Sequence, residues 1–284
     1  HHRPLLAIFL ISWCHAYNDS LLHQTLSSVF ILPAVEHSCN VLPSVGQQTQ
    51  CLQRPGLQKV LTSARQLASD TCKKIFQYEA WDCPTPNSTA FNIDDRETAF
   101  LHALYTATLV YKITEACRSD DKVLTHCGST DVYPWSALCP NSDNVDYSVQ
   151  FTLSFLDITE ADPHQSDIRQ HNALMGIKEV KLSLIEECSV GGIMCCHKRL
   201  KPLRDIVDAL KDFYHSAIHL PQPPEYIRPQ FLKQYNDSLV YISESAQTCG
   251  TPGRECLFPE HCQDICCGQK FQSIVHRQDW RCRC

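Results

Sequence analysis

The sequence predicts a mainly α-helical N-terminal domain with disulfide-stapled hairpins, followed by a small cysteine-rich β domain at the C-terminus. The chain has 18 cysteines in 284 residues, and seven of them fall within its last 36 residues. Apolar residues recur at helical spacing from about residue 56 to 218, and residues 140–187 contain no cysteine. Four prolines then interrupt residues 220–237, so we expect a linker between the two parts.

The cysteines indicate an oxidising compartment, where they form crosslinks. Zinc binding is the competing interpretation. Zinc sites use regular C-x2-C pairs with a matching second pair or histidines, whereas Cys262-x3-Cys266-Cys267 has no repeated partner. We therefore expect no metal, and we expect disulfides in the tail that involve Cys249, Cys256, Cys262, Cys266 and Cys267.

The first 16 residues resemble a signal peptide. Leu5 to Trp13 form an apolar run that is too short for a bilayer, which needs about 20 residues. Cys14-His15-Ala16 offers a cleavage site, so the mature chain is expected to start near Tyr17. A buried core helix is the alternative. No other stretch approaches transmembrane length, and we expect a secreted, extracellular protein without a transmembrane segment.

Three N-glycosylation sequons occur in the sequence. They begin at Asn18, Asn87 and Asn236, and in each a serine or threonine follows two residues later. We expect these three asparagines to be glycosylation sites of a secreted chain.

The helices can be placed from capping and periodicity. Asp94 is the expected N-cap of a helix, with Glu97 three residues on. Its core-facing stripe consists of Phe100, Ala103, Leu104, Ala107, Val110 and Tyr111. Further helices are expected from near Asn144 or Asp146, over Ile168 to Glu187, and from Pro202 to about Ser216, the last with Leu203, Ile206, Val207, Leu210 and Tyr214 inward.

The prolines after residue 220 mark the expected boundary between the helical domain and the C-terminal domain. Residues 17–220 form the expected helical domain, and residues 221–247 form a linker that ends in a short strand over 238–243. Residues 248–284 form the cysteine-rich domain, which is too small to bury much apolar surface and depends on crosslinks.

Motifs for catalysis and for nucleic-acid binding are weak or absent. The sequence has no G-x-S-x-G elbow, H-E-x-x-H helix or phosphate-binding glycine loop, so we expect neither an enzyme nor a cofactor. A net charge of −6 without a lysine-arginine run argues against a nucleic-acid partner. His171 and the Cys196-His197 pair are the remaining catalytic candidates, and they keep a secreted helical hydrolase open as an alternative.

Eight segments, in order, resemble the Wnt family of secreted signalling proteins. They are Cys72 to Cys83, the RETAF sequence from Arg96, Cys139 to Asp157, His171 to Val180, Asp205 to Tyr214, Asp237 to Tyr241, Gly250 to Cys256 and Cys262 to Gly268. The resemblance covers roughly residues 60–284. It implies a Wnt-like fold and an extracellular ligand rather than a catalyst.

The resemblance also implies a partner and a way of binding it. Wnt proteins grip the cysteine-rich domain of Frizzled receptors at two points, with an acylated hairpin thumb from the helical domain and a hairpin finger from the C-terminal domain. Rigid, crosslinked hairpins suit this role because they lose little entropy on binding. Much of the family's finger is absent from this sequence, so we expect residues 248–284 to be a truncated domain.

The thumb departs from the family pattern. Here it reads Ser189, Val190, Gly191, Gly192, Ile193 and Met194 between cysteines, with about four residues fewer than the family loop. Ser189 is the one candidate for the acyl group, and it lacks the family's H-G-x-S-G context. We expect no acylation and no acyl-lipid carrier as a partner. The alternative is a loop that is merely degenerate.

An unlipidated Wnt with a shortened thumb resembles an insect member of the family that antagonises Toll–Dorsal signalling. We therefore expect feedback inhibition of that pathway in embryonic patterning and innate immunity. A secreted module that binds without signalling is the alternative.

The resemblance further implies three disulfides. These are Cys72–Cys83, Cys117–Cys127 and Cys188–Cys196. Cys139 loses its family partner and is left with Cys195, Cys39 or Cys51, and the pairing in the tail stays open.

Overall fold

The structure is a computed structural model. It describes residues 21–30, 39–83, 93–118, 124, 127, 143–158, 168–191, 193–221, 229–245, 254–256, 258–267 and 270. The signal peptide expected over residues 1–16 lies outside the described residues, and the domain boundaries given above stay predictions.

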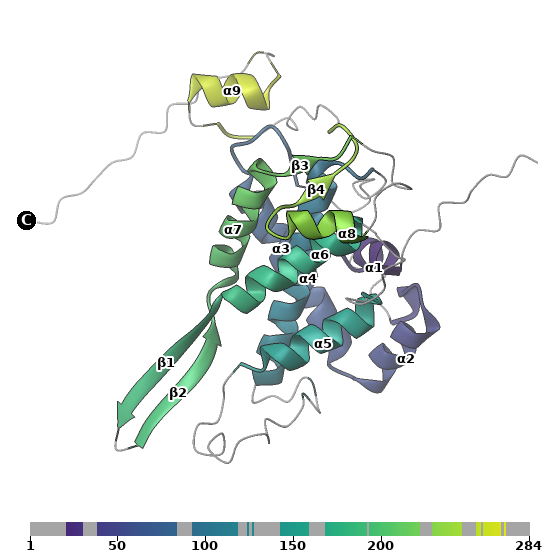
Figure 1. The fold of residues 1–284 in the computed structure, drawn as a ribbon, viewed down its shortest axis with the longest axis vertical. Coiled ribbons are helices and arrows are strands. Elements are labelled where there is room, and N and C mark those ends of the chain that lie inside the picture. Colours follow the sequence, from purple (N-terminus) through teal and green to yellow (C-terminus); the bar gives the residue numbers. More distant parts are fainter. Residues whose placement is uncertain are drawn as a thin grey trace, which may run out of the picture.

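The described chain is mainly helical, as predicted (Figure 1). The helices are α1 (Leu21–Phe30), α2 (Val45–Gln53), α3 (Leu57–Ile75), α4 (Arg96–Arg118), α5 (Val145–Leu156), α6 (Ile168–Leu182), α7 (Leu203–His215), α8 (Pro229–Leu232) and α9 (Pro259–Ile265), with 3-10 turns η2 (Cys39–Val41) and η5 (Lys233–Tyr235). The strands are β1 (Leu184–Gly191), β2 (Ile193–Leu200), β3 (Ile218–His219) and β4 (Val240–Tyr241).

Helix α4 forms the centre of the helical domain. Every residue from Thr98 to Val110 is buried, because α3, α5, α6 and α7 all pack against this helix. The stripe predicted from the sequence is therefore only part of what α4 buries. Two threonines inside this core donate to carbonyls of their own helix, Thr108 Oγ1 to Leu104 at 2.8 Å and Thr114 Oγ1 to Val110 at 2.9 Å.

The N-cap of α4 is Asp95 and not the predicted Asp94. Asp95 Oδ1 accepts the backbone N–H of Thr98 at 2.8 Å. Asp94 instead pairs with Arg169 of α6, where Nε donates to Oδ1 at 2.7 Å and Nη2 to Oδ2 at 3.2 Å. Both of these side chains are largely buried. Asp94 therefore forms an ion pair with a residue of another helix, and Asp95 caps α4.

Two of the predicted helices have the predicted starts, and α7 also has the predicted buried face. Asn144 caps α5 by accepting the Tyr147 N–H at 3.1 Å. Helix α7 follows Pro202 and ends at His215, and its five predicted inward residues are all buried. Local signals were sufficient here because each helix has one buried face.

Helix α6 ends at Leu182, so the prediction that it continues to Glu187 is wrong. The Ser183 N–H closes the last turn by donating to the Glu179 carbonyl at 3.0 Å. From Leu184 the backbone pairs with β2 instead. The five residues assigned to the helix therefore belong to a turn and a strand.

The strand predicted over residues 238–243 is present as β4. It pairs in parallel with β3, with Ile218 opposite Val240 and His219 opposite Tyr241. In the tail, the element formed by described residues is α9, and Arg254 joins this region to the helical domain. Its guanidinium donates to the carbonyls of Phe76 at 2.7 Å and Ala80 at 3.3 Å.

Candidate functional site: the stapled hairpin

Strands β1 and β2 form an antiparallel hairpin that projects from the helical domain (Figure 1). The register runs from Leu184 opposite Leu200 at the base to Gly191 opposite Ile193 at the tip. Gly192, the residue between the strands, lies outside the described residues. Consecutive glycines suit such a reversal because glycine adopts turn conformations without steric cost.

The register places the predicted thumb residues at the far end of the hairpin. Ser189 lies opposite Cys195, and Val190 lies opposite Met194. These residues are thus parts of paired strands rather than of an open loop. Sequence reasoning gave no strand over Leu184 to Glu187, and its assignment of the segment to a receptor-binding thumb stays a prediction.

A disulfide between Cys188 and Cys196 staples the hairpin just behind this end. The two cysteines are direct partners in the register. Such a crosslink restricts the unfolded hairpin and contributes about 2–3 kcal/mol in the chain-entropy account. The staple holds the tip of the hairpin in one register.

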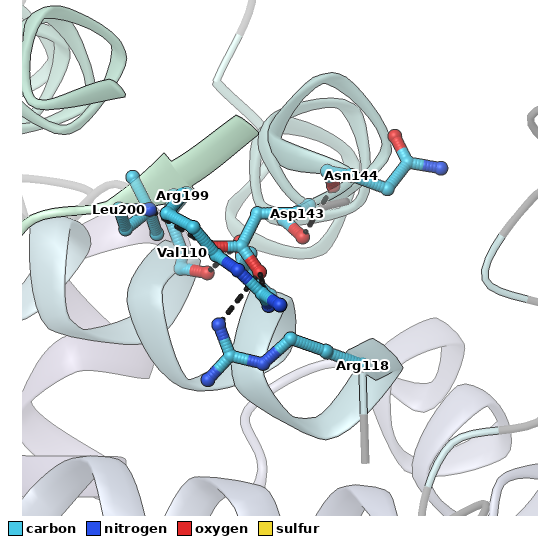
Figure 2. Close-up of polar contacts among 8 residues, drawn as sticks. Val110, Arg118, Asp143, Asn144, Arg199 and Leu200 are labelled. Atoms are coloured by element: carbon cyan, nitrogen blue, oxygen red, sulfur yellow. Dashed lines mark hydrogen bonds and ion pairs between the residues drawn. The ribbon is translucent and has the colours of Figure 1, made fainter. Parts of the chain in front are cut away.

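Asp143 anchors the base of the hairpin (Figure 2). Its carboxylate accepts the backbone N–H of Leu200 at 2.8 Å and a bond from Arg118 Nη1 at 2.8 Å. Arg199 Nη1 lies 3.9 Å from the same carboxylate. The Asp143 side chain is only 1% exposed, so this charge depends on these partners for its solvation.

Main-chain contacts complete the anchor. The Asp143 N–H donates to the Lys198 carbonyl at 2.8 Å, and the Lys201 N–H donates to the Ser183 carbonyl at 3.1 Å. Asn144 Nδ2 donates to the Cys127 carbonyl at 3.0 Å, next to the Cys117–Cys127 disulfide. The segment before α5 therefore fixes the direction in which the hairpin leaves the domain. Sequence reasoning assigned no such role to Asp143, although its motif precedes the helix.

Two exposed apolar side chains lie near the base of the hairpin. Leu182 is 65% exposed at the end of α6, and Ile185 is 37% exposed on β1. Ile185 lies opposite Arg199, so the root combines apolar and basic groups.

The structure contains the three disulfides that the resemblance implies: Cys72–Cys83, Cys117–Cys127 and Cys188–Cys196. It also joins Cys39 to Cys51, so neither is available to Cys139. Cys139 itself lies outside the described residues.

The described tail cysteines are bonded with one exception. Cys256 pairs with Cys262, and Cys267 is also disulfide-bonded. Cys266 carries a free thiol among the described cysteines, so its prediction as a disulfide residue is corrected. Cys262 is bonded to Cys256, and Cys267 is bonded to a cysteine other than Cys266, so neither is available to Cys266. Cys249 lies outside the described residues.

Two of the catalytic candidates, His171 and Cys196, have structural roles, and the third, His197, lies on β2 opposite Glu187. His171 Nε2 lies 3.0 Å from the Ser238 carbonyl, and burial lowers the pKa of this imidazole. Cys196 is bonded to Cys188 and therefore supplies no thiolate nucleophile. Glu186 lies near both sulfur atoms, but sulfurs shared in a disulfide are not the thiolate ligands that zinc prefers.

One of the three sequon asparagines lies in the described part of the chain. Asn236 is exposed, directly after η5. Asn18 and Asn87 lie outside the described residues.

Among the described helices, none combines the length and the apolar character needed to cross a membrane.

The family assignment follows from sequence comparison. The model of the Wnt family matches residues 41–284, and the chain belongs to this family. Protein Wnt-4 of Drosophila melanogaster is 27% identical over 303 residues, which cover 94% of this chain and 56% of that protein. Human Wnt-9b is 27% identical over 285 residues, covering 87% of this chain and 78% of that protein. The chain thus spans little more than half the length of the Drosophila relative.

Solved structures support the Wnt-like fold. A chain in the structure of human WLS in complex with WNT8A matches with a TM-score of 0.56 and 22% identity, over 89% of this chain and 86% of that one. The N-terminal domain and linker of Drosophila WntD match with a TM-score of 0.53 and 22% identity, over 67% of this chain and 97% of that one.

Proposed function

We propose that this chain is a secreted Wnt ligand that carries no acyl group and binds the cysteine-rich domain of a Frizzled receptor through its stapled hairpin. Its output would be feedback inhibition of Toll–Dorsal signalling in embryonic patterning and innate immunity, as for the insect protein called Wnt inhibitor of Dorsal. We expect no acyl-lipid carrier among its partners.

The observation that carries the proposal is the position of Ser189. This residue is the one serine of the shortened thumb, and its backbone is paired with Cys195 next to the Cys188–Cys196 staple. A modifying enzyme would have to act on a short, paired strand that lacks the family's recognition sequence.

Binding without an acyl chain has an energetic consequence. Each buried CH2 contributes on the order of 0.8 kcal/mol, so a lipid-free thumb gives up a large apolar contribution. The rigidity of the hairpin offsets part of this loss by reducing the entropy cost of association. The exposed apolar side chains of Leu182 and Ile185 add contact area at the root.

The first test is the mass of the secreted protein, followed by binding of detergent-free protein to a panel of Frizzled cysteine-rich domains. We expect the mass of an unacylated chain and saturable binding to at least one domain. The Ser189→Ala variant should bind with unchanged affinity. A palmitoleate adduct on Ser189 would contradict the absence of acylation.

The role of the hairpin is tested by replacing both staple cysteines, Cys188→Ala with Cys196→Ala. We expect weaker receptor binding while the helical domain keeps its circular dichroism spectrum. Ser189→Ala is the matched control, since it changes the same strand without removing the crosslink. Equal affinity of the stapled and unstapled proteins would place receptor binding elsewhere on the chain.

The inhibitory output is tested in insect cells that carry a Dorsal reporter. Added protein should lower reporter activity after Toll stimulation. Receptor binding without this effect would support a ligand of another pathway, and neither effect would favour a non-signalling module.

A further inference from the structure

We propose that the outer edge of β1 is a docking edge for an extended, basic segment of a partner protein, which adds to the hairpin as a third β-strand. In the part of the chain that the structure describes, β1 pairs with β2 alone. The other side of an edge strand presents backbone N–H and C=O groups to which a further strand can bond. Figure 1 shows the hairpin projecting away from the helices.

A hydrogen bond at the base shows which backbone groups face this edge. The Lys201 N–H donates to the Ser183 carbonyl at 3.1 Å, so these residues form a hydrogen-bonded pair across the hairpin. In antiparallel strands such pairs alternate with pairs that exchange no hydrogen bond. Ile185 and Glu187, two and four residues after Ser183, therefore bond to β2. The backbone groups of Glu186, between them, point to the outer side.

Asp143 supports the same alternation from the other side of the hairpin. It donates its N–H to the Lys198 carbonyl at 2.8 Å, and its carboxylate accepts the Leu200 N–H at 2.8 Å. Lys198 and Leu200 therefore direct their backbone groups away from β1. Their partners in the register, Glu186 and Leu184, direct theirs away from β2.

The staple extends the alternation toward the tip. The Cα atoms of Cys188 and Cys196 are 3.9 Å apart. In antiparallel strands this distance is about 4.5 Å where no hydrogen bonds join the two residues and about 5.5 Å where they do. Cys188 therefore also presents its N–H and C=O to the outer side. Leu184, Glu186 and Cys188 form a row of outward backbone groups, spaced as a third strand requires.

The two edges of the hairpin differ in what already contacts them. On β2, Asp143 uses the outward groups of Lys198 and Leu200. On β1, no backbone hydrogen bond between described residues uses the outward groups of Glu186 or Cys188. The open edge is therefore the edge of β1.

The charge of this edge indicates the kind of partner. Glu186 and Glu187 are both exposed, and none of the ion pairs between described residues uses either carboxylate. Successive side chains alternate between the two faces of a sheet, so each face carries one of these charges. Opposite charges on neighbouring strands stabilise a sheet. Two adjacent basic residues on the added strand fit this pattern.

A second copy of this chain fits the edge less well. Antiparallel pairing of two β1 strands would bring Glu186 and Glu187 of one copy against the same two residues of the other, and like charges opposite each other are destabilising. Pairing with β2 of another copy would displace Asp143 from that strand. The occupant is therefore a different protein. The docking edge requires neither the absence of an acyl group nor a particular receptor.

The experiment uses the full secreted protein and a fluorescein-labelled peptide of sequence Thr-Val-Lys-Lys-Val-Thr-Val, with fluorescence anisotropy as the readout. One control peptide has two glutamates in place of the lysines. Another has both lysines N-methylated, which keeps the charges but removes a backbone donor from each edge of the peptide. We expect saturable binding of the first peptide and roughly tenfold weaker binding of both controls. Equal affinity of either control would overturn the proposal.

A charge reversal separates recognition from misfolding. Glu186→Lys combined with Glu187→Lys should weaken binding of the lysine peptide and strengthen binding of the glutamate peptide, which a misfolded hairpin cannot do. Glu244→Lys combined with Glu255→Lys makes the same change in net charge at exposed positions outside the hairpin and should keep the wild-type preference. An unchanged preference in the first variant would overturn the proposal.

Hydrogen exchange locates the bound peptide. The amides of Glu186 and Cys188 should exchange more slowly with peptide bound, whereas that of Glu187, which already faces β2, should change little. Protection elsewhere only, or a dimer of the free protein that the lysine peptide dissociates, would overturn the proposal. Frizzled binding, measured on the same variants, reports on the proposed function separately.

Discussion

Asn172 and Val240 exchange two hydrogen bonds although they lie 68 residues apart in the sequence. Asn172 Nδ2 donates to the Val240 carbonyl at 2.9 Å, and the Val240 N–H donates to Asn172 Oδ1 at 3.0 Å. Both residues are buried. The amide of α6 thus pairs with β4 as a neighbouring strand would, and it attaches the end of the linker to the helical domain.

Replacing Asn172 by aspartate should destabilise the protein by about 2–3 kcal/mol, because the new carboxylate has no N–H for the Val240 carbonyl and is buried. The free energy of unfolding in denaturant measures the change. Lys178→Gln is the control, since it removes the exposed pair with Asp237 and should cost less than about 1 kcal/mol. An equal loss of unfolding free energy in the two variants would mean that the buried hydrogen bonds of Asn172 stabilise the fold no more than the exposed ion pair does.

Asp143→Asn should loosen the hairpin. The amide keeps the shape of the side chain but presents an NH2 group toward donors, so the unfolding free energy is expected to fall by about 1–3 kcal/mol. Hydrogen exchange should accelerate in β2 more than in α4. Asp208→Asn, in an exposed pair 3.6 Å from Arg204, is the control and should change stability by less than about 0.5 kcal/mol. Unaltered exchange at the Leu200 amide would show that Asp143 is not the anchor.

Gly176→Ala tests the contact between α6 and α4. A Cβ at this glycine would lie 2.1 Å from the Ala103 carbonyl oxygen, so the two helices would have to separate. We expect a loss of roughly 3 kcal/mol, measured by thermal or denaturant unfolding. At Gly46, the nearest atom to an added Cβ is Ser44 Oγ at 3.4 Å, and Gly46→Ala should be neutral or stabilising by up to about 1 kcal/mol. Similar stability of the two variants would contradict the close packing.

Alkaline pH should destabilise the protein through two tyrosines. Burial raises the pKa of both Tyr105 and Tyr214, and the Glu97 carboxylate raises that of Tyr214 further. An unfolded tyrosine ionises near about pH 10, so this stabilisation is fully present below that pH and is lost as pH rises above it. Unfolding free energies measured on both sides of pH 10 should show the decline.

Tyr214→Phe tests this assignment. The variant keeps the ring between Phe76, Trp81 and Phe100 but removes the hydroxyl that donates to Glu97 at 2.8 Å. Its stability should therefore fall less steeply with rising pH than that of the wild type. A slope identical to the wild type would assign the alkaline loss to other groups.

The sequence predicted those helices whose signals are local. Asn144 and Pro202 mark the starts of α5 and α7 because the residues that follow have one apolar face. The predicted cap of α4, Asp94, lies one residue before the actual cap, because Asp94 pairs with Arg169, which is 75 positions away in the sequence. Neighbouring aspartates look alike until the distant cation is known.

The hairpin was harder to predict than the helices. Charged residues occur at successive positions on both strands, including Glu186, Glu187, Lys198 and Arg199, so no alternation of apolar and polar residues marks them. The same segment continues the apolar pattern of α6, which favoured a longer helix. Its anchor depends on Asp143 meeting Leu200 across 57 residues, which spacing alone does not reveal.

The five disulfides with both cysteines described join residues that are 12, 11, 10, 8 and 6 positions apart. Short loops cost little entropy to close, so each pair can meet soon after its segment leaves the ribosome. Oxidation can then proceed segment by segment during synthesis, before distant cysteines become available as competitors. The order in which the chain emerges would itself help to select the correct partner for each of these cysteines.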